Sequence, residues 1–132
     1  MRNDRNRRRI RYIYSQLEKR DHEKSKKSLG ELGAAVASIG LMQALLLALR
    51  TGEETEAQAE ILGGWLVSEG SQCKGYLLTG GQTDWDRQQG LKMLVATLIE
   101  IDDTMAAMAL TDEAIRYLSH AKLVAGALKG TA

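Results

Sequence analysis

The residues that most often carry out catalysis are scarce in this sequence and lie far apart. The histidines are His22, in a polar segment, and His120, which has no carboxylate or cysteine three or four residues away. A histidine acts as a general base or a metal ligand only beside a suitable partner. The single cysteine, Cys73, lies among glycines and has no neighbour that would activate its thiol. We therefore expect no catalytic residue, no metal site, no cofactor and no enzymatic activity.

Two further patterns have a possible chemical use. Glu100, Asp102 and Asp103 follow an apolar run, as magnesium ligands follow a strand in nucleotide-binding proteins. The apolar run has helical spacing, however, and no Gly-x-x-x-x-Gly-Lys-Ser/Thr loop accompanies it. The glycine pairs 63–64 and 80–81 lack the strand and helix that would direct their amides at a phosphate. We interpret the acidic residues as a solvated helix end and the glycines as turn or packing positions.

Basic residues near the start of the chain provide the strongest chemical signal. Residues 1–27 hold 11 of the 18 lysines and arginines but four of the 17 acidic residues, which gives this segment a net charge of +7 and the remainder −6. Arginine predominates, and its planar guanidinium suits phosphate contacts and stacking on bases. Binding of this kind depends little on base sequence. The charge distribution favours a polyanion, an acidic protein surface, or both as partners.

A helix from about Asp4 to about Arg20 is predicted to present these charges. The apolar residues of this segment have the spacing of a single core-facing helix side. They are Ile10, Ile13, Tyr14 and Leu17. At about 100° per residue, the opposite side is predicted to be a basic stripe with one aromatic residue. That stripe comprises Arg5, Arg8, Tyr12 and Lys19. Residues 21–27 contain no apolar residue and are predicted to form a linker or a solvated turn.

Apolar spacing and glycine positions predict further helices along the rest of the chain. They are expected from Ser25 or Ser28 to Ile39, over 41–51, from Glu53 or Thr55 to Glu69, from Asp84 to Asp102, and from the N-cap Thr111 to Lys129 with Ile115 facing inward. A brief helix is expected within 70–83, and a short helix or turn over 103–110. The helix after Gly40 should be buried on all sides, and Met42, Met93, Met105 and Met108 should fill the core. The prediction is an all-α, compact single-domain bundle of about five to seven helices over 1–132, with 1–27 as a basic N-terminal helix and linker.

The composition supports this fold class. Proline and phenylalanine are absent, and good helix formers dominate the 132 residues. The lone cysteine allows no intramolecular disulfide, which favours a reducing, cytoplasmic location. The most apolar run, 41–49, is too short to span a membrane, and the first residues lack the apolar core of a secretion signal. We therefore expect a soluble protein.

Two segments, residues 40–45 and 113–118, carry patterns that occur together in a known family. The first reads Gly-Leu-Met-Gln-Ala-Leu, and the second reads Glu-Ala-Ile-Arg-Tyr-Leu with Lys122 and Ala125 after it. They resemble the Gly-Leu-x-Gln-Ala-Leu signature and the closing helix of the small helical subunit of type III-B CRISPR (Cmr) RNA-guided effector complexes. An arginine-rich first helix also fits. Leu47 and His120 stand where that family often has aromatic residues, and its upstream proline is missing.

The resemblance implies a non-catalytic subunit that stacks in several copies along the effector backbone in antiviral defence. Its partners would be other Cmr subunits, further copies of itself, the guide RNA and the target RNA. Lysines and arginines would contact phosphates, and one tyrosine would stack on a base. These candidate RNA-binding residues are Arg5, Arg8, Arg11, Tyr12, Lys19, Lys24, Lys26, Lys27 and Lys122.

Two alternatives remain open. The chain could be a helical adaptor or a homo-oligomeric interaction protein with no nucleic-acid role, whose basic segment docks on an acidic protein surface. It could also be an enzyme whose active-site residues are distant in sequence, which a pocket lined by perturbed carboxylates or by His120 would indicate.

Overall fold

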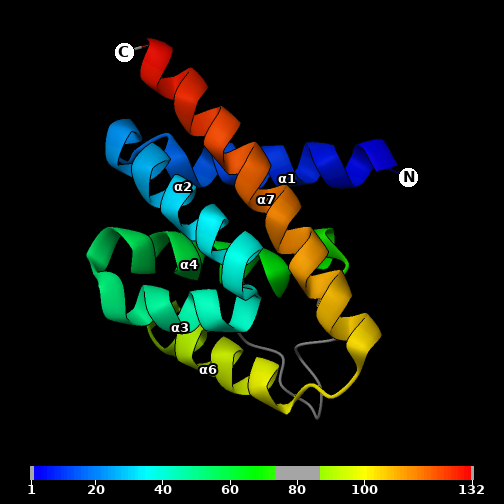
Figure 1. The fold of residues 1–132 in the computed structure, drawn as a ribbon. Helices are drawn as coiled ribbons and strands as arrows, with labels where there is room; N and C mark the ends of the chain where they lie inside the picture. The colour runs from blue at the N-terminus through cyan, green and yellow to red at the C-terminus, as the bar shows by residue number, and fades with distance from the viewer. Residues whose placement is uncertain (1, 74–86, 132) are drawn as a thin grey trace.

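The computed structural model describes residues 2–73 and 87–131. These residues form six α-helices and one 3-10 helix, without a strand. In chain order they are α1 (Arg2–Leu17), α2 (His22–Ile39), α3 (Leu41–Thr51), α4 (Glu53–Leu66), the 3-10 helix η1 (Glu69–Ser71), α6 (Arg87–Glu100) and α7 (Thr104–Thr131) (Figure 1). The predicted all-α class and number of helices are confirmed. Within the described ranges, no helix has the length and the apolar character needed to cross a membrane.

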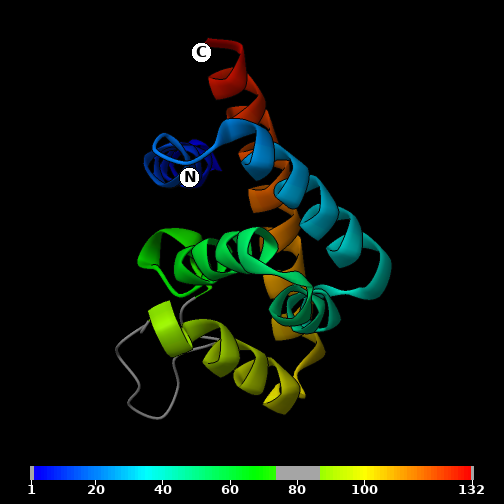
Figure 2. The same ribbon diagram turned by 90° about the vertical axis from the view of Figure 1, so that its left-hand side faces the viewer.

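The bundle is organised around α7, which has 28 residues and is therefore about 42 Å long. This helix packs most extensively on α2 and also contacts α1, α3 and α4. α1 runs across α7 in Figure 1 and is seen nearly end-on in Figure 2, on the outside of the bundle. Helices α3, α4 and α6 pack on one another and form the other end of the molecule. The position of α1 thus depends mainly on its contacts with α7.

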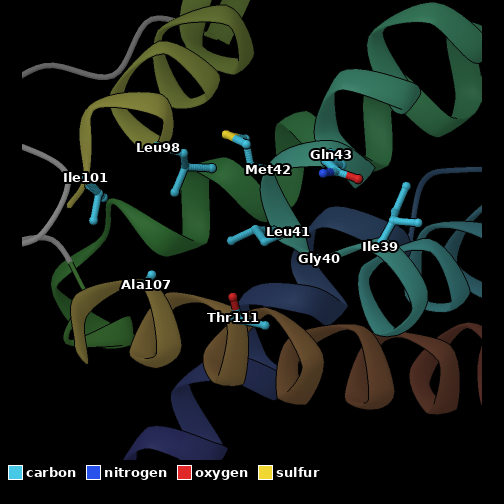
Figure 3. Close-up of a pocket in the computed structure, with 9 residues that line it drawn as sticks. All are labelled: Ile39, Gly40, Leu41, Met42, Gln43, Leu98, Ile101, Ala107 and Thr111. Atoms are coloured by element: carbon cyan, nitrogen blue, oxygen red, sulfur yellow. The ribbon is translucent and has the colours of Figure 1, made fainter. Parts of the chain in front are cut away.

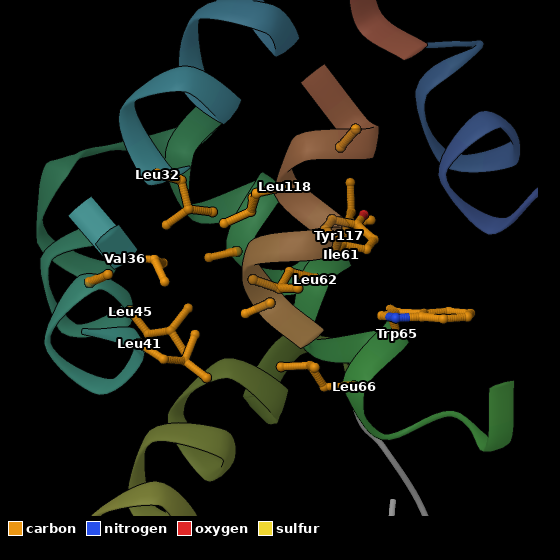
Figure 4. Packing of buried hydrophobic residues seen from close by; sticks show 14 of the residues in the cluster. Leu32, Val36, Leu41, Leu45, Ile61, Leu62, Trp65, Leu66, Tyr117 and Leu118 are labelled. Atoms are coloured by element: carbon orange, nitrogen blue, oxygen red, sulfur yellow. The ribbon is translucent and has the colours of Figure 1, made fainter. Parts of the chain in front are cut away.

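The hydrophobic core lies where α2, α3, α4 and α7 meet (Figure 4). Each helix supplies leucine, isoleucine or valine side chains at helical spacing, so that one stripe of each is removed from water. Central members of the core are Leu32, Val36, Leu41, Leu45, Ile61, Leu62, Trp65, Leu66, Tyr117 and Leu118. Burial of these side chains is the main favourable contribution to folding.

Two glycines create the sharp turns that let α2, α3 and α4 fold back on one another. Gly40 separates α2 from α3 with φ of 89°, and its N–H donates to the carbonyl of Val36. Gly52 separates α3 from α4 with φ of 142°. Residues with a side chain rarely adopt these conformations, whereas glycine does so readily. The helix boundaries predicted at Gly40 and Gly52 are confirmed.

The prediction of a linker or turn over 21–27 is wrong for most of that segment. α2 begins at His22, because the Asp21 side chain accepts a hydrogen bond from the Lys24 N–H (3.0 Å) and so caps the helix. This backbone hydrogen bond lowers the pKa of Asp21 below its ordinary value. Ser25, the first residue of α2 to be fully buried, packs without an apolar side chain. Apolar spacing alone therefore predicts a start for α2 that is several residues too late.

The predicted start of the last helix at Thr111 is also wrong. α7 begins at Thr104, and Thr111 lies inside it. The Asp103 carboxylate accepts hydrogen bonds from the N–H groups of Met105 (2.9 Å) and Ala106 (3.4 Å), which are the bonds of an N-cap. Between Asp103 and Thr111 the chain contains alanine, methionine and leucine, which favour helix, and no glycine or proline to interrupt it.

Several apolar side chains that were expected in the core lie on the surface. Met105 is 77% exposed and Met108 is 66% exposed, so these two do not fill the core. Ile115 on α7 is exposed as well, and the exposed side chains of Leu46 and Leu47 show that α3 is not buried on all sides.

The end predicted for α4 also differs from the structure, since the helix ends at Leu66 rather than at Glu69. The predicted start of a helix at Asp84, and all but the first residues of the 70–83 segment, lie outside the described residues.

Candidate nucleic-acid interface

A buried ion pair holds α1 against the rest of the molecule. Arg9 of α1 is only 1% exposed, and its Nε and Nη2 atoms donate to both carboxylate oxygens of Glu113 on α7, at 2.6 and 2.7 Å. Glu113 is 2% exposed and also accepts a hydrogen bond of 2.8 Å from the indole Nε1–H of Trp65 on α4. A two-point pair of this kind is among the strongest polar contacts that a protein makes. It ties α1 to both α4 and α7.

The remaining polar atoms around Arg9 are also satisfied. Its Nη1 atom donates to the side-chain oxygen of Asn6 at 2.7 Å and lies 3.3 Å from Nδ1 of His120. Partial burial lowers the pKa of His120, and the neighbouring Arg9 guanidinium adds to that effect. A neutral imidazole is therefore favoured beside Arg9. A buried charge is tolerated only when such partners replace the lost water.

The ion pair determines which side of α1 faces solvent. Ile13 and Leu17 follow Arg9 by one and two turns and are fully buried with it. At 100° per residue, Arg7 and Arg11 lie about 160° away from Arg9 around the helix. Both are exposed, as is Arg8. The exposed face of α1 is therefore strongly basic, although it is not the face expected from the apolar pattern.

The expected division of α1 into an apolar and a basic side needs two corrections. The apolar spacing predicts Ile10 and Tyr14 in the core, but they are 42% and 49% exposed. Tyr12, which was placed on the basic side, is half-buried and its hydroxyl donates to the carbonyl of Ile61 at 2.6 Å. The Tyr12 ring lies 5.4 Å from that of Trp65, centroid to centroid, so it packs against the body of the protein rather than presenting its face to a ligand.

Arg5 is also less available than its position in the sequence indicates. Its guanidinium donates a hydrogen bond to the Gln72 side chain, and Nη1 lies 3.7 Å from a Glu113 oxygen. These contacts direct Arg5 towards the buried ion pair. It contributes to holding α1 in place and, contrary to the prediction from the sequence, is not free to contact a ligand.

The other candidate cations are all exposed but do not share one surface. They are Arg8 and Arg11 on α1, Lys19 after its end, Lys24, Lys26 and Lys27 on the first turns of α2, and Lys122 on α7. Lys122 follows Glu113 by nine residues, which places it about 180° around α7, on the side away from α1. The structure therefore groups the arginines of α1 but separates Lys122 from them.

The lysines of α2 have a mixed electrostatic environment. Lys24 and Lys27 line a shallow cleft of about 330 Å³ together with Glu31, Glu53 and Glu54. Nearby acidic side chains reduce the attraction of these lysines for an anion. Among the described residues no ion pair involves the lysines of this cleft or Arg7, Arg8 and Arg11, so the difference between the two groups is the three glutamates that line the cleft. The three α1 arginines are therefore the better candidates for an anionic ligand.

The histidines and the cysteine do not form a reactive group in the described part of the chain. Cys73 is buried, and burial raises the pKa of its thiol, so that the thiol stays neutral near pH 7. His22 lies on the outside of α2, with a ring nitrogen 3.3 Å from the Glu18 carbonyl oxygen. Over the described ranges, no three histidine, cysteine or acidic side chains lie close enough together to hold a metal ion.

The residues that sequence reasoning missed are Arg7, Arg9 and Tyr14. Arg9, Ile13 and Leu17 follow each other at intervals of four, which is the spacing of a buried face, but an arginine is normally assigned to the surface. Its burial depends on a glutamate that lies 104 residues further along the chain. In comparisons with known proteins, no family model, no curated protein and no solved structure matches the chain.

Proposed function

We propose that the chain is a non-catalytic, RNA-binding subunit of a ribonucleoprotein assembly, and specifically the small helical subunit of a type III-B CRISPR (Cmr) effector complex. The observation that carries the RNA-binding part is the outward-facing group Arg7, Arg8 and Arg11 on a helix that a buried ion pair keeps in one orientation. Because the backbone of α1 is already fixed, only the arginine side chains have to be ordered when they contact phosphates.

The specific assignment to a Cmr complex rests on the resemblance of residues 40–45 and 113–118. Both segments have structural roles that fit shared packing positions. Gly40 makes the turn between α2 and α3, and Glu113 and Tyr117 are buried at the contact of α7 with α1 and α4. Guide RNA and target RNA are the proposed ligands, and the neighbouring subunits and further copies of the chain are the proposed protein partners.

The first test is binding of a fluorescent single-stranded RNA of roughly 40 nucleotides across a salt series. We expect binding that weakens steeply with salt. The triple variant Arg7→Ala, Arg8→Ala and Arg11→Ala should bind more weakly and should lower the slope of log K against log salt by about 2, since each single-strand phosphate contact contributes about 0.7.

A charge-matched control separates a specific surface from net charge. Arg50, Lys92 and Lys129 are exposed on α3, α6 and α7, and changing all three to alanine removes the same charge away from the arginines of α1. This control should retain most of the RNA affinity. Equal loss in both triple variants, or no binding by the wild type at low salt, would remove the support for an RNA surface on α1.

A second candidate function is that of a helical adaptor or homo-oligomer without a nucleic-acid role, and an apolar groove favours it. The groove has a volume of about 280 Å³ and lies between the start of α3, the end of α6 and the first half of α7 (Figure 3). It is lined by Ile39, Gly40, Leu41, Met42, Gln43, Leu98, Ile101, Ala107 and Thr111. Met108 and Ile115, three residues before and four residues after Thr111, are exposed on the same side of α7 as Thr111. Apolar surface of this kind is typical of protein contacts.

This candidate predicts self-association through the groove. Sedimentation of the wild type over a range of concentrations should show a dimer or larger species, and the double variant Ile39→Asp and Ile115→Lys should stay monomeric and folded. Loss of self-association with unchanged RNA binding would assign the two surfaces to different partners. If the wild type is monomeric at every concentration, the hypothesis of a homo-oligomer is wrong.

A further inference from the structure

The outward face of α1 combines its arginines with two exposed apolar side chains. Tyr14 and Ile10 are 49% and 42% exposed and lie one turn apart. Tyr14 follows Arg11 by three residues and Arg7 by seven, so these three side chains share one side of the helix. In Figure 2 the side of α1 that points away from α7 is not covered by another helix.

The charges on this face repel each other in the free protein. Arg7 and Arg11 are four residues apart, a spacing at which like charges destabilise a helix. Asp4 and Glu18 lie on the same side, yet neither forms an ion pair with these arginines among the described residues. A bound polyanion would relieve the repulsion, which favours an anionic partner over a neutral one.

An exposed tyrosine among arginines favours single-stranded RNA over duplex RNA. In duplex RNA the bases are paired and stacked inside, so a convex helix surface reaches phosphates and 2′-hydroxyls, and the tyrosine ring finds no exposed base face on which to stack. An unpaired base exposes its flat face and stacks on an aromatic ring whatever its identity. Ile10, one turn away, extends the apolar support beneath such a base.

We propose that this face of α1 binds an unpaired stretch of RNA, with Tyr14 stacking on one base and Arg7 and Arg11 contacting the phosphates on either side. The inference rests on the proposed RNA-binding function and makes it more specific, because it selects single strands over duplexes. It also assigns the stacking position to Tyr14, whereas Tyr12 packs within the protein.

The test uses the full chain with single-stranded and duplex RNAs of roughly 12 nucleotides, a length typical of stacking sites. Tyr14→Ala should lower the affinity for the single strand about 5- to 160-fold, the range that follows from loss of one base stack. Tyr14→Phe retains the ring and should bind like the wild type. Duplex affinity and the salt dependence should stay unchanged in both variants. Leu123→Ala, which removes an exposed apolar side chain from α7, is the matched control and should have no effect.

The possible failures are distinguishable. If Tyr14→Ala binds the single strand as the wild type does while the triple arginine variant does not, stacking is wrong and the proposed RNA surface stands. Equal affinity of the wild type for single strand and duplex also overturns the inference. If the wild type prefers poly-glutamate to RNA of equal charge, the face is a protein-docking surface and both proposals are wrong.

Discussion

Replacing Glu113 with alanine should lower the free energy of unfolding by about 3–5 kcal/mol, because the change leaves the Arg9 guanidinium buried without an anion. Arg9 and Glu113 are 1% and 2% exposed, so water cannot take the place of the lost carboxylate unless α1 moves. The Trp65 indole N–H would lose its acceptor at the same time. Urea denaturation followed by far-ultraviolet circular dichroism measures the change.

A double variant shows whether the loss comes from the unpaired charge or from the missing volume. Changing Arg9→Met together with Glu113→Leu removes both charges and keeps an apolar side chain at each position. A buried ion pair replaced by apolar residues of similar size is often as stable as the original. We therefore expect the double variant to recover the part of the loss that comes from the unpaired charge, while the Trp65 indole N–H, still without its acceptor, accounts for a remaining loss of about 1–3 kcal/mol. A Glu113→Ala protein that is destabilised by less than about 1 kcal/mol would mean that Arg9 reaches solvent readily.

Leu62→Ala should cost about 2–5 kcal/mol, since it removes most of a fully buried side chain and leaves a cavity between helices. Leu62 is 0% exposed and lies at the centre of the core shown in Figure 4. The same chemical change at Leu123, which is 71% exposed, should cost less than about 0.5 kcal/mol. The midpoints of the two urea transitions give the comparison directly.

The result also tests how the core is shared between helices. If Leu62→Ala and Leu123→Ala lowered the free energy of unfolding by the same small amount, α4 would be loosely packed against α2 and α7. The conclusion that these helices share one packed core would then be wrong. If Leu62→Ala affected the slope of the transition as well as its midpoint, the change would extend to the denatured state or to cooperativity.

Local chemistry allowed much of the fold to be predicted from the sequence. Gly40 and Gly52 end helices because of their own backbone freedom, and leucines at helical spacing mark the buried sides of α2 and α4. The errors arose where a helix forms without an apolar marker. The first turns of α2 are polar and are started by Asp21, and the first turns of α7 leave Met105 and Met108 in solvent.

The candidate site was harder to predict because it depends on contacts between distant residues. The rotation of α1 is set by Arg9 and Glu113, and nothing near Arg9 in the sequence indicates that a carboxylate will meet it. Once Arg9 is placed inside, Tyr12 turns inward and Tyr14 turns outward. A segment with a net positive charge could be recognised from composition alone, whereas the residues on the exposed face of α1 could not.

The separation of Arg9 and Glu113 by 104 residues has a consequence for how the protein comes to fold during its synthesis. α1 leaves the ribosome before its partner side chain on α7, which follows 104 residues later. Contacts between such distant positions form late, since a long loop must close first. Until that contact forms, α1 is exposed to solvent. Repulsion between its positive charges and those of α1 in other nascent chains then disfavours association. We therefore expect the exposed arginines of α1 to limit aggregation of this helix before folding is complete.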